Sequence, residues 1–167
     1  PPPPTHSFFL MIRRPQRSTP KPSTAASDVY KRQTVDNEII SEISLGLLIF
    51  LGVYKGDEKK DSEYIAKKIT ALRIFSDEKG KMNLSVSDVK GSILVVSQFT
   101  LCANLKRGSR PSFIEAAPPN IGQSLYDYFV SCLRKNDVEV QTGKFGANMD
   151  VELVNQGPAT FVIDSKV

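Results

Sequence analysis

Two short stretches combine an apolar strand pattern with small polar residues, and we expect the functional site to lie where they meet. In the first, the apolar run Ile93-Leu94-Val95-Val96 leads directly into Ser97-Gln98-Phe99-Thr100-Leu101. This pattern is typical of a buried strand that ends in hydroxyl and amide groups. The second stretch, residues 155–160, reads Asn-Gln-Gly-Pro-Ala-Thr and precedes the strand-like residues 161–163.

Other segments also have strand patterns. Residues 38–43 form one, and residues 45–53 are almost entirely apolar, which predicts a central strand covered on both faces. Short strands are expected near 138–140 and 151–153, where valine and leucine alternate with polar residues.

Two segments have the 3.6-residue periodicity of helices. In the first, Asp61 is expected to cap the start, and the apolar stripe is Ile65, Ile69 and Leu72. The second follows two prolines, and Asn120 and Gln123 have the spacing of a capping box. Its predicted core residues are Leu125, Tyr128, Phe129, Cys132 and Leu133. This order of elements predicts a mixed α/β fold without the regular alternation of a Rossmann domain.

Residues 1–33 differ in composition from the rest of the chain. They hold seven of the 11 prolines, six of the 22 basic residues and one of the 18 acidic residues. We therefore expect a folded domain at 34–167 and an N-terminal segment outside it. Three interpretations of the segment stay open: translated adapter or vector sequence, a disordered extension, or a transit peptide.

Composition also excludes several function classes. The net charge is +4, but residues 34–167 alone carry −1, which argues against nucleic-acid binding through bulk charge. The single histidine, His6, lies in the N-terminal segment, so residues 34–167 cannot supply a catalytic triad. Cys102 and Cys132 lack metal-binding spacing and are expected to be buried, reduced thiols in a reducing cytoplasm. We expect no metal, no cofactor and no membrane span.

The polar residues after the first strand point to hydrogen bonding rather than nucleophilic attack. The hydroxyls of Ser97 and Thr100 have no neighbouring base, so we expect both, with Gln98, to donate or accept hydrogen bonds. Backbone N–H groups nearby would hold an oxyanion. A substrate group, such as a ribose hydroxyl, would then assist the reaction.

Two other motifs each allow a structural and a functional interpretation. Gly157-Pro158 is either a plain turn or a rigid backbone element beside a ligand. The basic loop 104–111 is either solvated or contacts phosphates through Lys106, Arg107 and Arg110.

Taken together and in order, four motifs resemble the D-aminoacyl-tRNA deacylases of the D-tyrosyl-tRNA deacylase type. The resemblance runs from about Thr34 to Ser165. Its motifs are Ser97-Gln98-Phe99-Thr100-Leu101, Lys106-Arg107-Gly108-Ser109-Arg110-Pro111-Ser112-Phe113, Thr142-Gly143-Lys144-Phe145-Gly146 and Asn155-Gln156-Gly157-Pro158-Ala159-Thr160.

The resemblance implies a cytoplasmic homodimer with a β-rich, barrel-like α/β fold, two main helices and sites at the subunit interface. Its substrate would be D-aminoacyl-tRNA, or glycyl-tRNA mischarged on tRNA-Ala, whose ester is hydrolysed to free tRNA and amino acid. The tRNA 2′-hydroxyl is thought to assist catalysis in this family.

The resemblance also implies roles for individual residues. The catalytic pocket would be lined by Ser97, Gln98, Phe99 and Thr100. Gly157 and Pro158, joined by a cis bond, would exclude L-amino acids from the partner's pocket. Substrate-binding positions would be Ala116, Phe145 and Met149, and tRNA-binding positions Lys106, Arg107 and Arg110.

At the N-terminus the chain departs from the family. Members begin with a strand that carries a Gln-Arg-Val-type motif, whereas this chain has Val29-Tyr30-Lys31-Arg32-Gln33. We therefore expect the family-type first strand to be missing, which would expose a sheet edge. A non-catalytic RNA-binding module and an inactive truncated fragment are the alternatives to a deacylase.

Overall fold

The computed structural model describes residues 8–12, 31–35, 38–106, 108–153 and 160–166. The elements in chain order are β1 (Phe8–Ile12), β2 (Lys31–Val35), β3 (Glu38–Ile43), β4 (Gly46–Leu51), α1 (Lys59–Ala71), β5 (Phe75–Ser76), β6 (Met82–Leu84), β7 (Ser92–Ser97), the 3₁₀ helix η1 (Phe99–Cys102), α2 (Pro119–Arg134), β8 (Val140–Thr142), β9 (Asp150–Glu152) and β10 (Thr160–Ile163).

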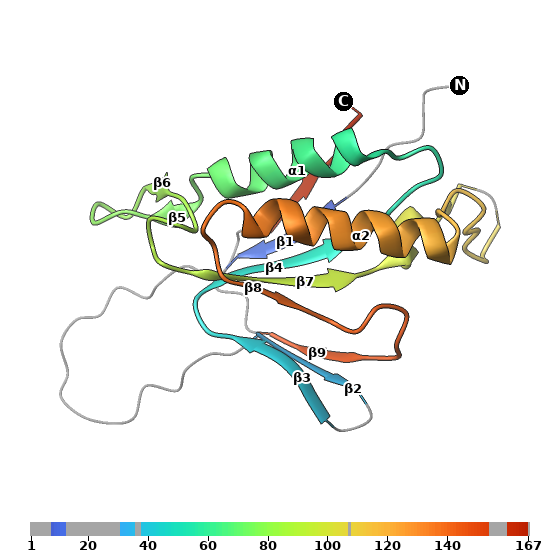
Figure 1. Cartoon of the computed structure of the whole chain (residues 1–167), viewed down its shortest axis with the longest axis horizontal. Helices are drawn as coiled ribbons and strands as arrows, with labels where there is room; N and C mark the ends of the chain where they lie inside the picture. The colour runs from blue at the N-terminus through green and yellow to red at the C-terminus, as the bar shows by residue number, and fades with distance from the viewer. Residues whose placement is uncertain (1–7, 13–30, 36–37, 107, 154–159, 167) are drawn as a thin grey trace.

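These elements form three layers (Figure 1). The middle layer is a five-stranded sheet in the order β10-β1-β4-β7-β8, in which β4, β7 and β8 run parallel. Helices α1 and α2 cover one face, and a three-stranded sheet, β3-β2-β9, lies on the other side. A small β5-β6 hairpin follows α1. The predicted mixed α/β class with two main helices is confirmed.

The apolar run of β4 divides its side chains between the two outer layers. Leu47 and Ile49 pack in the large core beneath the helices, whereas Leu48 packs in a smaller cluster toward the three-stranded sheet. In β7, Ile93 and Leu94 alternate in the same way. A strand between two layers needs apolar residues on both faces, so the prediction of a central strand at 45–53 is confirmed.

Both helices begin differently from the prediction. Helix α1 is capped by Glu58, whose backbone N–H donates to the Asp61 carboxylate at 2.8 Å in a capping box, so Asp61 is the third helical residue. Helix α2 starts at Pro119 with no side-chain cap, so the expected role of Asn120 as cap is wrong. Proline suits the first helical position because its missing N–H would have no partner there.

The sheet edge that we expected to be exposed, for want of the family-type first strand, is covered by β1. Its backbone pairs antiparallel with β4 and with β10, in register from Phe9 opposite Phe50 and from Phe8 opposite Ile163. The apolar run of residues 8–12 has strand character, and its pairing covers the edge of β4 that would otherwise lie open.

Residues 31–33 also belong to the fold, although we expected them to lie outside it. They are part of β2, which pairs with β3 and β9. Gln33 is fully buried, and its amide Nε2 lies 2.8 Å from the Met149 sulfur. The side chain of Arg32 pairs with Glu42 at 2.9 Å. Residues 1–7 and 13–30 of the N-terminal segment lie outside the described residues.

Barrel closure, which the family resemblance implied, is not found. The described strands form open sheets, and β10 and β8 are the edges of the largest one. In the part of the chain that the structure describes, no helix is long and apolar enough to cross a membrane.

Candidate functional site

A cavity of about 570 Å³ lies where the parallel strands β4 and β7 end. Ligands in α/β proteins commonly bind at the carboxyl ends of parallel strands. Five chain segments meet here: the end of β4, the turn after β7, residues 113–117, the first turn of α2 and the loop after β8. The lining residues are Leu51, Val53, Lys55, Ser97, Phe99, Phe113, Ile114, Ala116, Ala117, Pro118, Pro119, Gly122, Phe145, Gly146, Ala147 and Asn148.

The end of β7 brings part of the predicted catalytic set to this cavity. Ser97 lines it, whereas Gln98 and Thr100 lie beside it and bond to each other, with Gln98 Nε2 donating to Thr100 Oγ1 at 2.5 Å. The Gln98 backbone N–H donates to the Leu51 carbonyl, which fixes the turn to β4. The first N–H groups of η1, those of Phe99 and Thr100, have no acceptor inside the helix.

Close contact between β4 and η1 depends on Gly52. A Cβ at this position would meet Leu101 Cβ at 3.0 Å and Cys102 Sγ at 3.2 Å. Both contacts are tighter than packed side chains normally make. Glycine therefore lets the polar turn after β7 lie directly against the end of β4.

Aromatic rings form two sides of the cavity. The rings of Phe99 and Phe113 meet edge to face with centroids 5.1 Å apart, and both are exposed at the rim. On the opposite side, Phe145 packs edge to face on Tyr126 at 5.8 Å. Such edge-to-face pairs favour fixed ring positions. The predicted site residues Phe99 and Phe145 therefore lie on one cavity.

Tyr126 is a supporting residue that the sequence analysis missed. It is buried, and its hydroxyl donates to the Val95 carbonyl at 2.8 Å, which ties α2 to β7 beneath the cavity. Burial raises the pKa of Tyr126 to about 12. The predicted stripe placed Tyr128 in the core instead, but Tyr128 is half-buried and donates to Glu63.

Ala116, the weakest of the motif matches, lies on the cavity wall because it pairs with the chain after β4. Tyr54 and Ala116 form an antiparallel bridge, the Lys55 N–H donates to the Glu115 carbonyl at 2.8 Å, and the Ala117 N–H donates to the Val53 carbonyl at 2.9 Å. The wall is therefore a short two-stranded ribbon.

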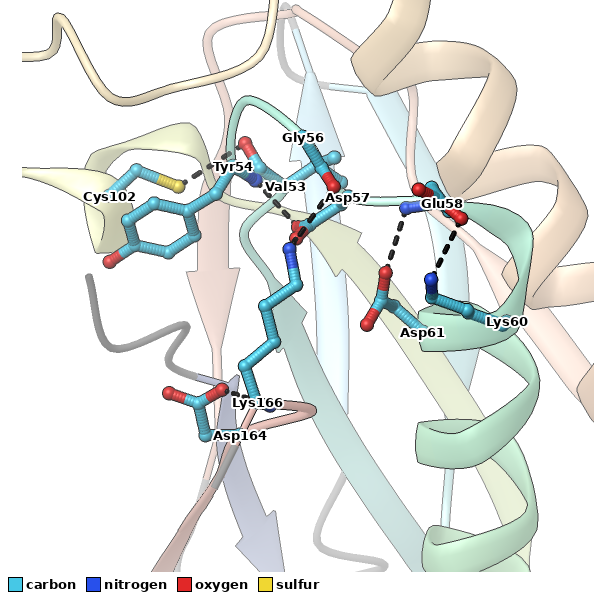
Figure 2. Close-up of polar contacts among 10 residues, drawn as sticks. All are labelled: Val53, Tyr54, Gly56, Asp57, Glu58, Lys60, Asp61, Cys102, Asp164 and Lys166. Carbon is cyan, nitrogen blue, oxygen red and sulfur yellow. Dashed lines mark hydrogen bonds and ion pairs between the residues drawn. The ribbon is translucent and has the colours of Figure 1, made fainter. Parts of the chain in front are cut away.

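A polar network holds the turn at the end of this ribbon (Figure 2). The Tyr54 N–H donates to the Asp57 carboxylate at 2.8 Å, and Lys166 Nζ donates to the Gly56 carbonyl at 3.1 Å and to Asp57 at 3.0 Å. Nearby, the Cys102 thiol donates to the Val53 carbonyl at 3.4 Å. Burial, reinforced by the Asp57 and Glu115 carboxylates, raises the pKa of Cys102 to about 12, so this thiol is not a nucleophile at neutral pH.

The remaining predicted residues do not line the cavity or fall outside the description. Met149 packs in the small cluster on the far face of the sheet and contacts Gln33. Lys106 and Arg110 are exposed on the loop beyond Phe99. Arg107, Gly157 and Pro158 lie outside the described residues.

The cavity can hold an apolar or aromatic group and offers few ionisable side chains. Among the described residues that line it, Lys55 is the only charged one, and none has a carboxylate or an imidazole. Among the described residues, no cluster of three or more metal-ligating side chains occurs. The polar groups that the described lining offers are hydroxyl, amide, ammonium and backbone groups.

Comparison of sequences gives matches over most of the chain. The family model described as D-Tyr-tRNA(Tyr) deacylase matches residues 27–164. A D-aminoacyl-tRNA deacylase of Thermotoga petrophila (strain ATCC BAA-488 / DSM 13995 / JCM 10881 / RKU-1) is 54% identical over 131 residues, which cover 78% of this chain and 88% of that protein. One of Bacillus cereus (strain G9842) is 51% identical over 133 residues, with coverage of 80% and 91%.

Solved structures share the fold. The c-Myc DNA Unwinding Element Binding Protein superposes with a TM-score of 0.81 at 33% identity, covering 96% of this chain and 99% of that one. A probable eukaryotic D-amino acid tRNA deacylase superposes with a TM-score of 0.74, with the same coverage. At 15% identity, the second similarity shows the fold alone.

Proposed function

This chain belongs to the D-Tyr-tRNA(Tyr) deacylase family, and from that premise we propose that it hydrolyses the ester of D-aminoacyl-tRNA. The products are free tRNA and the D-amino acid. Glycyl-tRNA mischarged on tRNA-Ala is a second substrate of the same chemical form.

One observation supports placing this activity at the cavity. Four of the residues that family resemblance pointed to, Ser97, Phe99, Ala116 and Phe145, line a single cavity although they come from three separate segments. A cavity of about 570 Å³ has the size of a small-molecule site, as an aminoacylated adenosine requires.

The proposed chemistry follows from the groups that line the cavity. Water adds to the ester carbonyl, the bond from the carbonyl carbon to the ribose oxygen breaks, and the ribose oxygen takes up a proton. The Phe99 and Thr100 N–H groups and the Ser97 hydroxyl support an oxyanion on the carbonyl. The tRNA 2′-hydroxyl assists the proton transfer, which agrees with the absence of carboxylates and imidazoles from the described part of the lining.

Chiral selection is assigned to Gly157 and Pro158 of a partner subunit. In this proposal the protein is a cytoplasmic homodimer, and the Gly-Pro backbone of each protomer enters the other's cavity, where it clashes with L-side chains. The motif Asn155-Gln156-Gly157-Pro158-Ala159-Thr160 supports this assignment. A Pro158→Ala variant is expected to hydrolyse L-tyrosyl-tRNA as well, or to lose activity on both enantiomers.

The deciding experiment measures release of tyrosine from D-tyrosyl-tRNA and from L-tyrosyl-tRNA by the full chain. We expect hydrolysis of the D-ester only. Binding of both tRNAs with hydrolysis of neither would instead favour a non-catalytic RNA-binding module. A Cys132→Ala variant serves as a control, because this buried thiol lies in the helix–sheet core and not at the cavity.

A further inference from the structure

Lys55 stands out on the cavity wall because, of the lining residues that the structure describes, it alone is charged. Its side chain is exposed to solvent, unlike the buried residue Leu51 on the same lining. Neither its position in the sequence nor the family resemblance singled it out.

The backbone on both sides of Lys55 is fixed. Its own N–H donates to the Glu115 carbonyl at 2.8 Å, and Tyr54 before it bridges to Ala116. After it, the Gly56 carbonyl accepts a hydrogen bond from Lys166. Because this backbone is held in place, the Lys55 side chain begins at a fixed point on the cavity wall. Less conformational entropy is then lost when the side chain binds a ligand.

The acidic groups next to Lys55 in the sequence bond to other partners. Asp57 accepts from the Tyr54 N–H and pairs with Lys166 at 3.0 Å, and Glu58 pairs with Lys60 at 3.0 Å (Figure 2). Within the described residues, no ion pair joins Lys55 to a carboxylate. Its charge is therefore available to a ligand.

We infer that Lys55 binds the 5′-phosphate of the terminal adenosine, the phosphodiester that links this nucleotide to the rest of the tRNA. The inference rests on the proposed function. When the aminoacylated adenosine fills the cavity, the chain of the tRNA must leave through the mouth, where its first anionic group is this phosphate. A lysine acts there as a point charge that needs no fixed geometry.

The positive charge of the amino acid supports the same orientation of the substrate. The α-ammonium of the amino acid would be repelled by Lys55, so the aminoacyl end must lie away from it. The cation thus orients the substrate: phosphate toward Lys55, and ester toward Ser97 and the start of η1.

The test compares ligands with and without the phosphate. We expect the wild-type protein to bind adenosine 5′-monophosphate about five- to tenfold more tightly than adenosine, a gain between those of an exposed and a buried ionic contact, because Lys55 is exposed. Lys55→Met should abolish this preference, and Lys55→Arg should retain most of it. Lys67→Met, which removes the same charge from the exposed face of α1, should behave like the wild type.

Kinetics give a second readout. Lys55→Met should raise KM for D-tyrosyl-tRNA about five- to tenfold and leave hydrolysis of D-tyrosyl-adenosine, which has no phosphate, unchanged. The salt dependence of tRNA binding should also fall by about 0.7 in the slope of log K against log salt concentration.

The outcomes separate this inference from the proposed function. A wild-type protein that hydrolyses neither D-ester contradicts the proposed function, and the nucleotide-binding comparison then decides on Lys55 alone. The inference is overturned if the wild-type protein does not prefer adenosine 5′-monophosphate, or if Lys55→Met retains that preference. Equal losses on D-tyrosyl-tRNA and D-tyrosyl-adenosine would overturn it too, because they indicate a general change in the cavity.

Discussion

The ammonium of Lys166 lies 3.0 Å from a carboxylate oxygen of Asp57, although the two residues are 109 positions apart. Lys166 follows β10, and Asp57 belongs to the turn between β4 and α1. The pair therefore joins the end of the described chain to the turn that carries Lys55. The ion pair therefore holds in place the turn that follows Lys55 on the cavity wall.

We expect this ion pair to stabilise the fold measurably. The Asp57 side chain is 8% exposed, so its interaction with Lys166 is screened less than that of a surface pair. A double-mutant cycle with Asp57→Asn and Lys166→Met should give a coupling energy of about 1 kcal/mol in urea unfolding. The exposed pair Glu58–Lys60 is the matched control and should give about 0–0.5 kcal/mol. Equal coupling in the two cycles would contradict the prediction.

Gly52 is expected to tolerate no side chain. An alanine Cβ would lie 3.0 Å from Leu101 Cβ and 3.4 Å from the Gln98 carbonyl oxygen, so η1 would have to move. Gly52→Ala should lower the free energy of unfolding by about 1–3 kcal/mol and reduce kcat for D-tyrosyl-tRNA.

Gly122→Ala is the matched control for Gly52→Ala. Its Cβ would meet only Phe145, at an ordinary 3.7 Å, and alanine is favoured over glycine inside a helix by about 1 kcal/mol. This variant should be as stable as the wild type or more stable. A loss of stability as large as that of Gly52→Ala would show that the close approach of η1 is not the cause.

Removal of the Phe145 ring should weaken substrate binding. The ring lines the cavity and is held against Tyr126. Stacking of a base on an aromatic ring is worth about 1–3 kcal/mol, so Phe145→Ala should raise KM for D-tyrosyl-tRNA at least about fivefold. Tyr126→Phe, which keeps the ring contact and removes only the hydrogen bond to Val95, should change stability more than KM. An unchanged KM in Phe145→Ala would exclude the ring from substrate binding.

Alkaline pH should destabilise the protein through groups that are buried in their protonated form. Burial raises the pKa of Cys102 from 9.0 to about 12 and the pKa of Tyr126 from 10.0 to about 12. In the unfolded chain these groups lose their protons at lower pH, so their contribution is fully present below about pH 9 and is lost as the pH rises to about 12. Urea unfolding at a series of pH values measures this decline.

The Cys102→Ala variant tests whether the loss of stability that begins near pH 9 is caused by Cys102. It should begin to lose stability nearer pH 10 than pH 9. The wild-type thiol should also react with iodoacetamide at pH 8 only after unfolding. Rapid labelling of Cys102 in the folded protein would contradict the burial argument.

Several features of this protein could be predicted from local sequence pattern. The apolar run at 45–53 predicted a strand covered on both faces, because only a middle layer needs apolar residues on every side, and the run at 93–96 predicted a buried strand. The periodicity of α2 predicted the buried residues Leu125, Phe129, Cys132 and Leu133, but it selected Tyr128 where the structure buries Tyr126. Ser97 and Phe99, which the motif at the end of β7 predicted as site residues, both line the cavity, and their functional roles stay predictions.

Other features were decided only by tertiary structure, since they depend on pairing between distant segments. The composition of residues 1–33 indicated a segment outside the fold, yet Phe8–Ile12 pairs with β4 and β10, and Gln33 is buried against Met149. A strand's partners have no local signature, because the hydrogen bonds of the backbone are the same for every sequence. The position of Lys55 on the cavity wall could not be predicted for the same reason. It depends on the Tyr54–Ala116 bridge and on the contact of Lys166 with Asp57.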